Sequence, residues 1–363
     1  MKDRERLDVI AGRLRSREDG WKEYDVLPGE EQPSLKENFM PSWIYDDDYR
    51  DGIRVKKKYL EKFDGIKLED AISGEILCSE QGDCFIIKNL YDFKPFRIDK
   101  ELARKRILSN LQLLRGIGFE NEGKLKAGGY CSIEDLLHHS KWKEQAKRFI
   151  EMLDSGDALV IQEEMCHWLP RSHPLNLYVS AFTGKDCIKA FDIETMGLFS
   201  RPIILFGAAC IEGDQLCIVQ YLARNIEEEP AALSSFCSLI GSDPLLSYNG
   251  RSFDVPYINQ RRWYYDIGDD IRNTHFDMLP FARRAFKGTL PDTCLKTVEK
   301  YLFGHERMDD VPGALVPEFY EEYLKTGNPG PLVPIIEHNK QDLLMLMKIF
   351  SSFCEDECKD ERC

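Results

Sequence analysis

The chain has 363 residues, of which 43% are hydrophobic and 31% charged, which is typical of a globular protein with two or three domains. Its formal net charge of −14 is unfavourable for nonspecific nucleic-acid binding by the whole surface, so any such contact must be local. The charged N-terminus lacks the apolar run of a signal peptide, and the longest apolar run, residues 202–211, is too short to span a bilayer. No export or membrane role is indicated. Most of the 12 cysteines stand singly among apolar neighbours, which favours reduced thiols in a cytoplasmic protein.

The first 100 residues divide into two regions, and the sequence does not indicate a function for either. Residues 1–65 are charged and interrupted by prolines, which predicts linker segments and short amphipathic helices near Leu7–Leu14 and Val55–Phe63. In residues 66–100, two β-prone runs within Glu75–Ile87 flank a Gln-Gly-Asp turn. This second pattern predicts a β-hairpin.

Residues 101–155 are predicted to be a small helical module that binds nucleic acid. Residues 101–150 contain ten Lys and Arg against six Asp and Glu, which reverses the charge balance of the chain. Two helical stretches flank an Arg-Gly-Ile-Gly turn, and Ser132 with Asp135 predicts the N-cap of a further helix.

This arrangement resembles a helix-hairpin-helix motif, whose glycines let backbone N–H groups approach a phosphate while lysines neutralise it. The residues that would make sequence-independent contacts are Gly116, Gly118, Lys124 and Lys126. The alternative is an ordinary helical hairpin with a glycine at a C-cap. The local charge reversal favours nucleic-acid contact.

The segment 155–185 is predicted to be an irregular connector. It contains Cys166, His167 and His173, but no fourth residue has suitable metal-ligand spacing, so we interpret all three as loop residues.

At the other end of the chain, residues 353–363 are predicted to be an acidic, cysteine-rich tail. Its three cysteines could contribute to a metal site with a fourth ligand elsewhere, although frayed, solvated chain is the more usual structure. They are Cys354, Cys358 and Cys363.

Residues 186–352 alternate strand and helix signals, which predicts an α/β layer with a mixed sheet. The expected strands are Cys187–Ile193, Pro202–Ala209, Gln215–Leu222 and Pro244–Tyr248. The expected helices are 227–240, 254–265, 278–287, 293–303 and 332–350.

Two acids in the first of these strands predict a metal site. Asp192 and Glu194 are two residues apart, so on a strand both point to the same face. Carboxylates that close repel each other unless a cation lies between them, and hard oxygen ligands favour Mg²⁺ or Mn²⁺. The alternative is an exposed strand end without a role.

Further candidate residues lie downstream. Asp254 opens a helix directly after a buried strand, where N-capping alone could explain it. His338 and Asp342 are four residues apart and share one helix face, as a surface ion pair would. Tyr248 and Asn249 precede Asp254 and are candidates for contacting a substrate, or else a packed aromatic and a strand-end hydrogen bond.

Together these motifs resemble the DnaQ-like, or DEDD, exonuclease superfamily with its ribonuclease H-like fold. Phe191-Asp-Ile-Glu-Thr195 and Phe253-Asp-Val-Pro-Tyr257 are similar to the exonuclease domains of family B DNA polymerases. The segment 294–342 is more similar to the ribonuclease H-like domains of YprB-like proteins. The resemblance implies a ribonuclease H-like exonuclease domain over residues 186–352.

The resemblance also implies a mechanism and a ligand set. Two Mg²⁺ or Mn²⁺ ions would promote hydrolysis at a 3′ end, with Asp192 bridging both. Glu194 and Asp342 would complete the site of the ion that binds water, and Asp254 would hold the second. His338 would orient the water or take its proton. One departure concerns His338, because it has the four-residue spacing typical of family members with a tyrosine there.

The leading hypothesis is therefore a metal-dependent 3′–5′ exonuclease that acts on single strands or 3′ ends, with DNA favoured over RNA. Replication or repair proteins are the partners that this hypothesis suggests. One alternative is a nucleic-acid-binding scaffold with a weak or inactive nuclease fold. Another is a structure-specific endonuclease, because the fold alone does not fix end preference.

Overall fold

The computed structural model describes residues 24–27, 42–184, 187–198 and 200–359. The chain forms two compact units. The first comprises residues 1–71, 195–201 and 309–335, and the second comprises residues 72–194, 202–308 and 336–363.

Among its described residues, the first unit is mainly helical. Its elements are β1 (Tyr24–Leu27), β2 (Ser42–Tyr45), α2 (Asp46–Lys62), α3 (Leu68–Ala71), η6 (Gly313–Leu315) and α13 (Val316–Thr326), and β1 pairs with β2 in parallel. Three aspartates in the first turn of α2 favour its start, because they complement the helix dipole. The helix predicted near Val55–Phe63 is confirmed within α2, whereas the one predicted at Leu7–Leu14 lies outside the described residues.

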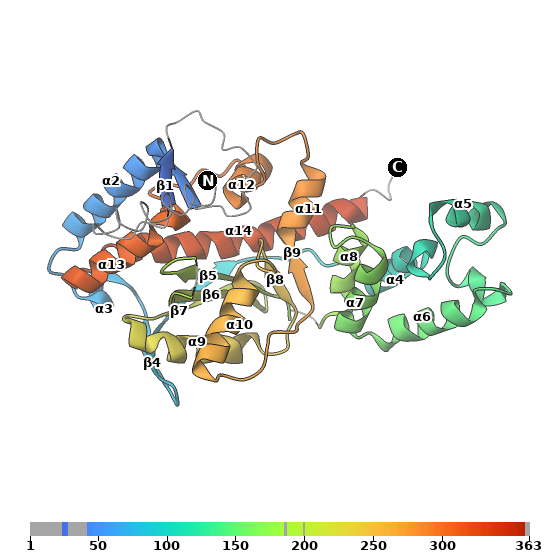
Figure 1. Cartoon of the computed structure of the whole chain (residues 1–363), viewed down its shortest axis with the longest axis horizontal. Helices are drawn as coiled ribbons and strands as arrows, with labels where there is room; N and C mark the ends of the chain where they lie inside the picture. The colour runs from blue at the N-terminus through green and yellow to red at the C-terminus, as the bar shows by residue number, and fades with distance from the viewer. Residues whose placement is uncertain (1–23, 28–41, 185–186, 199, 360–363) are drawn as a thin grey trace, which may run out of the picture. The chain divides into compact units, whose positions relative to one another are not determined.

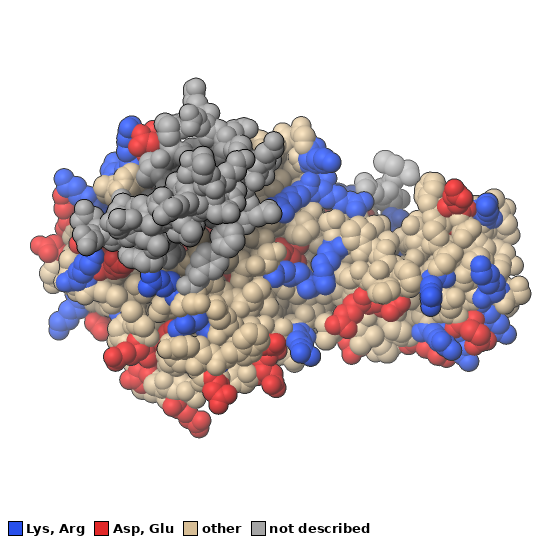
Figure 2. Space-filling model, in the orientation of Figure 1, with Lys and Arg blue, Asp and Glu red and all other residues tan. Residues whose placement is uncertain are grey.

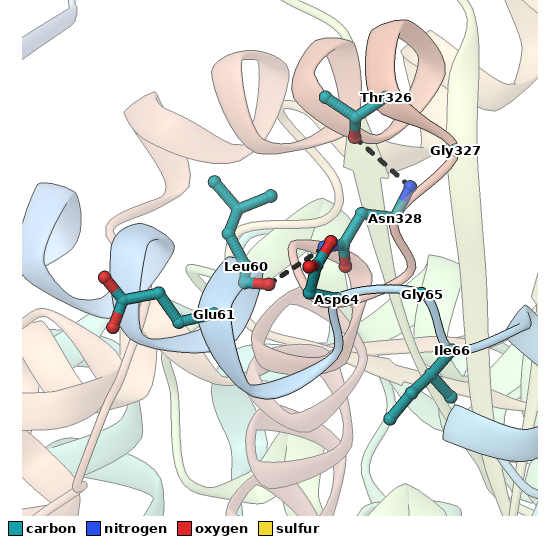
Figure 3. A pocket seen from close by; sticks show the side chains of 8 residues that line it. All are labelled: Leu60, Glu61, Asp64, Gly65, Ile66, Thr326, Gly327 and Asn328. Carbon is teal, nitrogen blue, oxygen red and sulfur yellow. Dashed lines mark hydrogen bonds between the residues drawn. The ribbon is translucent and has the colours of Figure 1, made fainter.

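The C-terminal ends of α2 and α13 enclose a shallow pocket of about 650 Å³ (Figure 3). Asn328 organises it, since its side-chain Nδ2 donates to the Leu60 carbonyl at 2.9 Å. The Asn328 backbone N–H donates to Thr326 Oγ1 at 3.2 Å. These bonds satisfy polar groups that a helix end would otherwise leave to water.

A seven-stranded mixed sheet forms the centre of the second unit, in the order β3-β4-β7-β6-β5-β8-β9 (Figure 1). The strands are β3 (Glu75–Ser79), β4 (Gly82–Asp92), β5 (Lys189–Thr195), β6 (Ile203–Glu212), β7 (Gln215–Leu222), β8 (Leu245–Ser247) and β9 (His275–Asp277). β3, β4, β7 and β6 pair antiparallel, whereas β5, β8 and β9 pair in parallel. The predicted mixed sheet is therefore confirmed.

Helices cover both faces of this sheet. On one face, α9 (Glu229–Ile240) and α10 (Asp254–Tyr265) bury Phe236 and Ile258 against Phe191 and Phe206. On the other face, α14 (Leu332–Lys359) contributes Leu343 and other apolar side chains to a second core. This second core also includes α11 (Met278–Ala285) and α12 (Leu295–Phe303). Within the described part of the chain, no helix combines the length and apolar character needed to cross a membrane.

A helical module precedes β5 in the chain. Its elements are α4 (Lys100–Leu108), η2 (Leu111–Leu113), α5 (Phe119–Ala127), η3 (Asp135–His138), α6 (Lys143–Ser155), α7 (Ala158–Trp168), α8 (Leu175–Tyr178) and η4 (Val179–Phe182). The helix predicted after Ser132 is only a 3₁₀ turn. The Asp135 carboxylate accepts the Ser132 N–H at 2.8 Å and the Asp135 N–H donates back to Ser132 Oγ, so the predicted cap does form.

One regional prediction is confirmed and extended, and two others are wrong. The hairpin predicted within residues 66–100 is confirmed, but it extends the central sheet because β4 pairs with β7. Residues 155–185 are not an irregular connector, since α7 and α8 occupy much of this segment and bury Ile161 and Met165. Most of the predicted tail is also helical, because α14 continues to Lys359 and buries Cys354.

α14 approaches β6 closely because Gly207 has no side chain. A Cβ on Gly207 would lie 2.1 Å from Asn339 Oδ1 and 2.8 Å from Leu343 Cδ1. Both atoms belong to α14, so any larger residue at position 207 pushes the helix away from the sheet.

We expect Gly207→Ala to destabilise the protein by about 1–3 kcal/mol, because the added methyl group overpacks this contact. Urea unfolding followed by circular dichroism measures the effect. Gly123→Ala is the matched control, since it lies within α5 with no atom near its added Cβ and alanine favours helix. Equal midpoints for Gly207→Ala and the natural protein would contradict the close approach.

Candidate active site

Asp192 and Glu194 lie on the face of β5 that α14 covers. Side chains alternate along the strand, so Ala190 packs into the α14-side core while Phe191 and Ile193 pack into the opposite core. The two acids therefore project toward α14. Glu194 is only 7% exposed, so its carboxylate is largely removed from water.

Asn339 on α14 fixes the position of Asp192. Its Nδ2 donates to Asp192 Oδ2 at 2.7 Å and to the Asp192 carbonyl at 3.2 Å. Its Oδ1 accepts Gln220 Nε2 from β7 at 2.8 Å, and the same Nε2 donates to the Ile336 carbonyl at 2.9 Å. A buried polar network thus connects three elements to the first predicted ligand.

Asp254 reaches the same area from the first turn of α10 and is 6% exposed. The loop before it is held by Asp277, whose carboxylate accepts the backbone N–H groups of Asn249 at 2.7 Å and Arg251 at 3.2 Å. Asp277 also caps α11 through the Leu279 N–H. It therefore positions the loop that leads to Asp254.

His338 and Asp342 face the acids from α14. His338 Nε2 lies 3.9 Å from Glu194 Oε1 and 3.6 Å from Asp342 Oδ2. The predicted four-residue spacing thus brings the imidazole between two of the predicted ligands. These two residues do not form a surface ion pair, because their side chains are 11% and 17% exposed.

Arg307 supplies a buried positive charge beside the acids. Its Nη1 lies 2.5 Å from Asp342 Oδ1, and its Nη2 donates to Glu299 Oε2 at 2.6 Å. The side chains of Arg307 and Glu299 are 6% and 1% exposed, so this is a desolvated network. Arg307 partly offsets the charge of Asp342.

The acids influence one another strongly. Burial raises the pKa of Asp192 well above its usual range, and the charges of Asp342, Glu194 and Asp254 raise it further, while the Asn339 hydrogen bond opposes the shift. Burial raises the pKa of Asp254 to about 7, and backbone hydrogen bonds from Asp254 and Ile193 only partly oppose this. Both shifts reflect several carboxylates in one desolvated place.

This donor set fits a divalent cation. Asp192, Glu194, Asp254 and Asp342 offer hard carboxylate oxygens, and a cation among them would relieve the repulsion that raises the pKa values of Asp192 and Asp254. No three of these four carboxylates have ligand atoms that all lie within 4.8 Å of one another in the described structure. Among the described residues, Cys210, Glu212 and Cys217 do meet this distance.

The Cys210 trio is a weak metal candidate by comparison. The two cysteines are cross-strand neighbours in the β6–β7 hairpin, and Cys210 Sγ is directed at the Cys217 carbonyl. Burial raises the pKa of Cys210, and it raises that of Cys217 to about 11. Metal ligation requires thiolates, so protonated thiols disfavour it.

The two predicted substrate contacts differ in their surroundings. The Tyr248 hydroxyl donates to the Thr293 carbonyl at 2.6 Å and its ring packs against the α14-side core, as the packed-aromatic alternative requires. Asn249 is exposed and adopts a φ of 72° in the loop before Asp254. Of these two residues, only Asn249 presents an exposed polar side chain.

The structure places the predicted phosphate-contacting residues around α5. Gly116 has a φ of 86°, which favours glycine, and Gly118 is the N-cap of α5. Lys124 lies in the last turns of α5, and Lys126 pairs with Glu122 at 2.9 Å. Phe119, directly after Gly118, is 85% exposed, which is unusual for a large apolar side chain.

The predicted cysteine site of the tail is only partly described. Cys354 is buried and Cys358 lies one turn later on α14, while Cys363 lies outside the described residues. On α10, Arg261 is buried and pairs with Glu229 at 2.5 Å, so it is not part of an exposed basic surface. Trp263 and Tyr264 of the same helix are 66% and 71% exposed.

Sequence reasoning missed three residues that support the site, namely Asn339, Arg307 and Gln220. Asn339 directly follows His338, so its proximity was the one available signal. Arg307 lies in a segment without regular structure, where no periodicity indicates the direction of a side chain.

Comparison with known proteins agrees with this geometry. Residues 190–354 match a family model described as the RNase_H superfamily. The mixed sheet flanked by helices is consistent with a ribonuclease H-like α/β fold. The chain is also 34% identical over 174 residues to the uncharacterized protein YprB of Bacillus subtilis (strain 168). That match covers 46% of this chain and 42% of YprB, so the chain spans less than half the length of this relative. Members of the superfamily are commonly nucleases and typically use divalent metal ions.

We expect Asn339→Ala to destabilise the protein by about 1–3 kcal/mol, because Asp192 and Gln220 lose a buried partner. Urea unfolding of the variant measures the cost. Asn328→Ala is the control, since it removes an asparagine hydrogen bond at a loop in the first unit. A loss for Asn339→Ala no larger than the control's would contradict the network.

The raised pKa of Asp254 predicts a pH dependence of the metal-free protein. An unfolded aspartate ionises near its ordinary pKa of about 3.9, whereas folded Asp254 ionises at about 7. Between these values the folded state holds the extra proton, so stability falls as the pH rises. Thermal unfolding in EDTA from about pH 5 to about pH 8 should show this decline.

Asp254→Asn should flatten this decline and raise the melting temperature at the alkaline end. Asp214→Asn, in the exposed β6–β7 turn, is the matched control and should follow the natural protein. Parallel profiles for Asp254→Asn and the natural protein would show that Asp254 ionises normally.

Proposed function

We propose that this protein is a metal-dependent 3′–5′ exonuclease that favours DNA. The observation that carries the proposal is the convergence of Asp192, Glu194, Asp254 and Asp342, with His338, around the end of β5. These residues come from three separate elements and occupy a desolvated place. A ribonuclease H-like domain supports phosphodiester hydrolysis as the reaction class.

The acids and the histidine would have distinct roles. Asp192, Glu194, Asp254 and Asp342 would hold two Mg²⁺ or Mn²⁺ ions. When bound, such ions would neutralise the phosphate and lower the pKa of water. Nε2 of His338, near Glu194 and Asp342, would orient the attacking water or take its proton. Asn339 would keep Asp192 in place, and Arg307 would set the direction of Asp342.

Several surfaces support nucleic acid as the substrate. Figure 2 shows Lys and Arg side chains gathered over α11, which carries the exposed Arg283 and Arg284. The module around α5 would add sequence-independent contacts through Lys124, Lys126 and the backbone at Gly116 and Gly118. Local basic surfaces of this kind allow a chain of net charge −14 to bind a polyanion.

Digestion of 5′-labelled single-stranded DNA and RNA with Mg²⁺ or Mn²⁺ tests the proposal. We expect a ladder that shortens from the 3′ end, faster for DNA, and no cleavage by Asp192→Ala or Asp342→Asn. His338→Gln should slow cleavage by about 10²–10⁴-fold, the usual range for a lost general base. Asp214→Asn is the control and should cleave normally.

Two outcomes would select an alternative. Cleavage of a circular single strand would indicate an endonuclease, because a circle has no 3′ end. Intact binding without metal-dependent cleavage would indicate a scaffold, and both variants of the acids would then bind like the natural protein.

Lys124→Ala with Lys126→Ala should weaken DNA binding measured by fluorescence anisotropy in EDTA. The slope of log affinity against log salt should fall by about 0.7 for each lysine that neutralises a single-strand phosphate. Lys105→Ala with Lys143→Ala removes the same charge from α4 and α6 and is the control. Equal losses in the two double variants would assign the effect to net charge and contradict the phosphate-contact hypothesis.

A further inference from the structure

A second polar pocket, whose lining includes none of the four acids, lies beside α7, β9 and the start of α10. It has a volume of about 240 Å³, smaller than a site for a drug-sized molecule and suited to a small polar group. Three arginines line it, Arg171, Arg251 and Arg272, together with one glutamate, Glu163. The lining therefore has an excess of positive charge.

Arg251 is fixed at this pocket by neutral acceptors. Its Nη2 donates to the His275 carbonyl at 2.7 Å and to Gln162 Oε1 at 3.2 Å. Gln162 is 4% exposed and is itself fixed, because its Oε1 accepts the His275 N–H at 2.9 Å and its Nε2 donates to the His275 carbonyl. In the described chain no carboxylate forms an ion pair with Arg251.

The other two arginines are exposed. Across the described residues, neither the Arg171 nor the Arg272 side chain forms a hydrogen bond or an ion pair. Burial, together with the charge of Arg171, lowers the pKa of Arg251 to about 10. Burial also lowers the pKa of His275 to about 3, with Arg251 and Arg171 adding to the shift, so this histidine is neutral. The nearby carboxylate of Asp277 is already occupied by three backbone N–H groups.

Positive groups that line one pocket without an ion-paired carboxylate favour the binding of an anion. Guanidinium groups present several N–H donors in a plane, which matches the oxygens of a phosphate. We propose that Arg171, Arg251 and Arg272 form a binding site for one phosphate group of a nucleic-acid strand.

The choice of a strand over a free phosphate comes from the loop that carries Arg251. This loop continues directly into Asp254, and Asp277 holds it through the N–H groups of both Asn249 and Arg251. A strand whose end lies at the acids would thus have another phosphate near Arg251. The inference rests on the proposed function only in its choice of ligand.

The test compares Arg171→Gln/Arg272→Gln with the natural protein in EDTA, so that no metal-dependent cleavage occurs. Affinity for a fluorescent single-stranded DNA oligonucleotide is measured by anisotropy over a range of salt. We expect affinity to fall by about tenfold, as for the loss of charge-assisted hydrogen bonds. The salt slope should fall by about 0.7, the value for one single-strand phosphate.

Arg50→Gln/Arg54→Gln is the matched control. These arginines of α2 are 70% and 75% exposed, and the double variant loses the same charge. It should bind DNA like the natural protein. Inorganic phosphate is a second probe, and it should raise the melting temperature of the natural protein more than that of Arg171→Gln/Arg272→Gln.

Unchanged DNA affinity in the pocket variant overturns the proposal. If inorganic phosphate still stabilises only the natural protein in that case, the pocket takes free phosphate and not a strand. Failure of the exonuclease proposal can be distinguished from failure of the pocket proposal. A natural protein that binds DNA through the pocket but does not cleave with Mg²⁺ contradicts the nuclease function and leaves the pocket established.

Discussion

The contact between Asn339 and Asp192 is the interaction on which the rest of the site depends. It forms only because α14 lies directly on β6 at Gly207, where a Cβ would be 2.1 Å from Asn339 Oδ1. The same helix carries His338 and Asp342, so the depth at which it packs fixes all three side chains relative to β5. The glycine at position 207 of β6 therefore determines how the acids are arranged. A helix held farther out would leave Asp192 and Gln220 without their shared partner.

A second constraint is the repulsion among the acids. Burial of several carboxylates is costly unless protons or cations compensate them. The raised pKa values of Asp192 and Asp254 mean that these acids keep protons more readily, which reduces the negative charge. The ion pair between Arg307 and Asp342 compensates part of the charge that is left. Arg307 in turn depends on Glu299, which is almost fully buried. The site thus stores unfavourable charge that a divalent cation would relieve, which is how metal binding and stability become linked.

The sequence predicted those parts that local pattern determines. β7 agrees with its predicted bounds, α10 begins at Asp254 as expected, and Gly304 ends α12 in a left-handed conformation. β9 was missed because three residues are too short for an alternation to be visible. α13 was not predicted, although Pro317 lies in its first turn, where proline is tolerated. The direction of Arg307 and the three-way role of Asn339 depend on tertiary packing, which no local pattern encodes.

The loop between β8 and α10 joins the two proposed binding functions. Asp277 accepts N–H groups from its start and its middle, and Gly250 lies so close to Ser247 that a Cβ would meet its Oγ at 2.5 Å. The loop is therefore rigid, and it carries Arg251 and Asp254 only three residues apart. Because a short rigid segment fixes both, the separation between a bound phosphate and the acids does not depend on domain movement. Such a fixed separation would determine which phosphodiester of a strand reaches the acids.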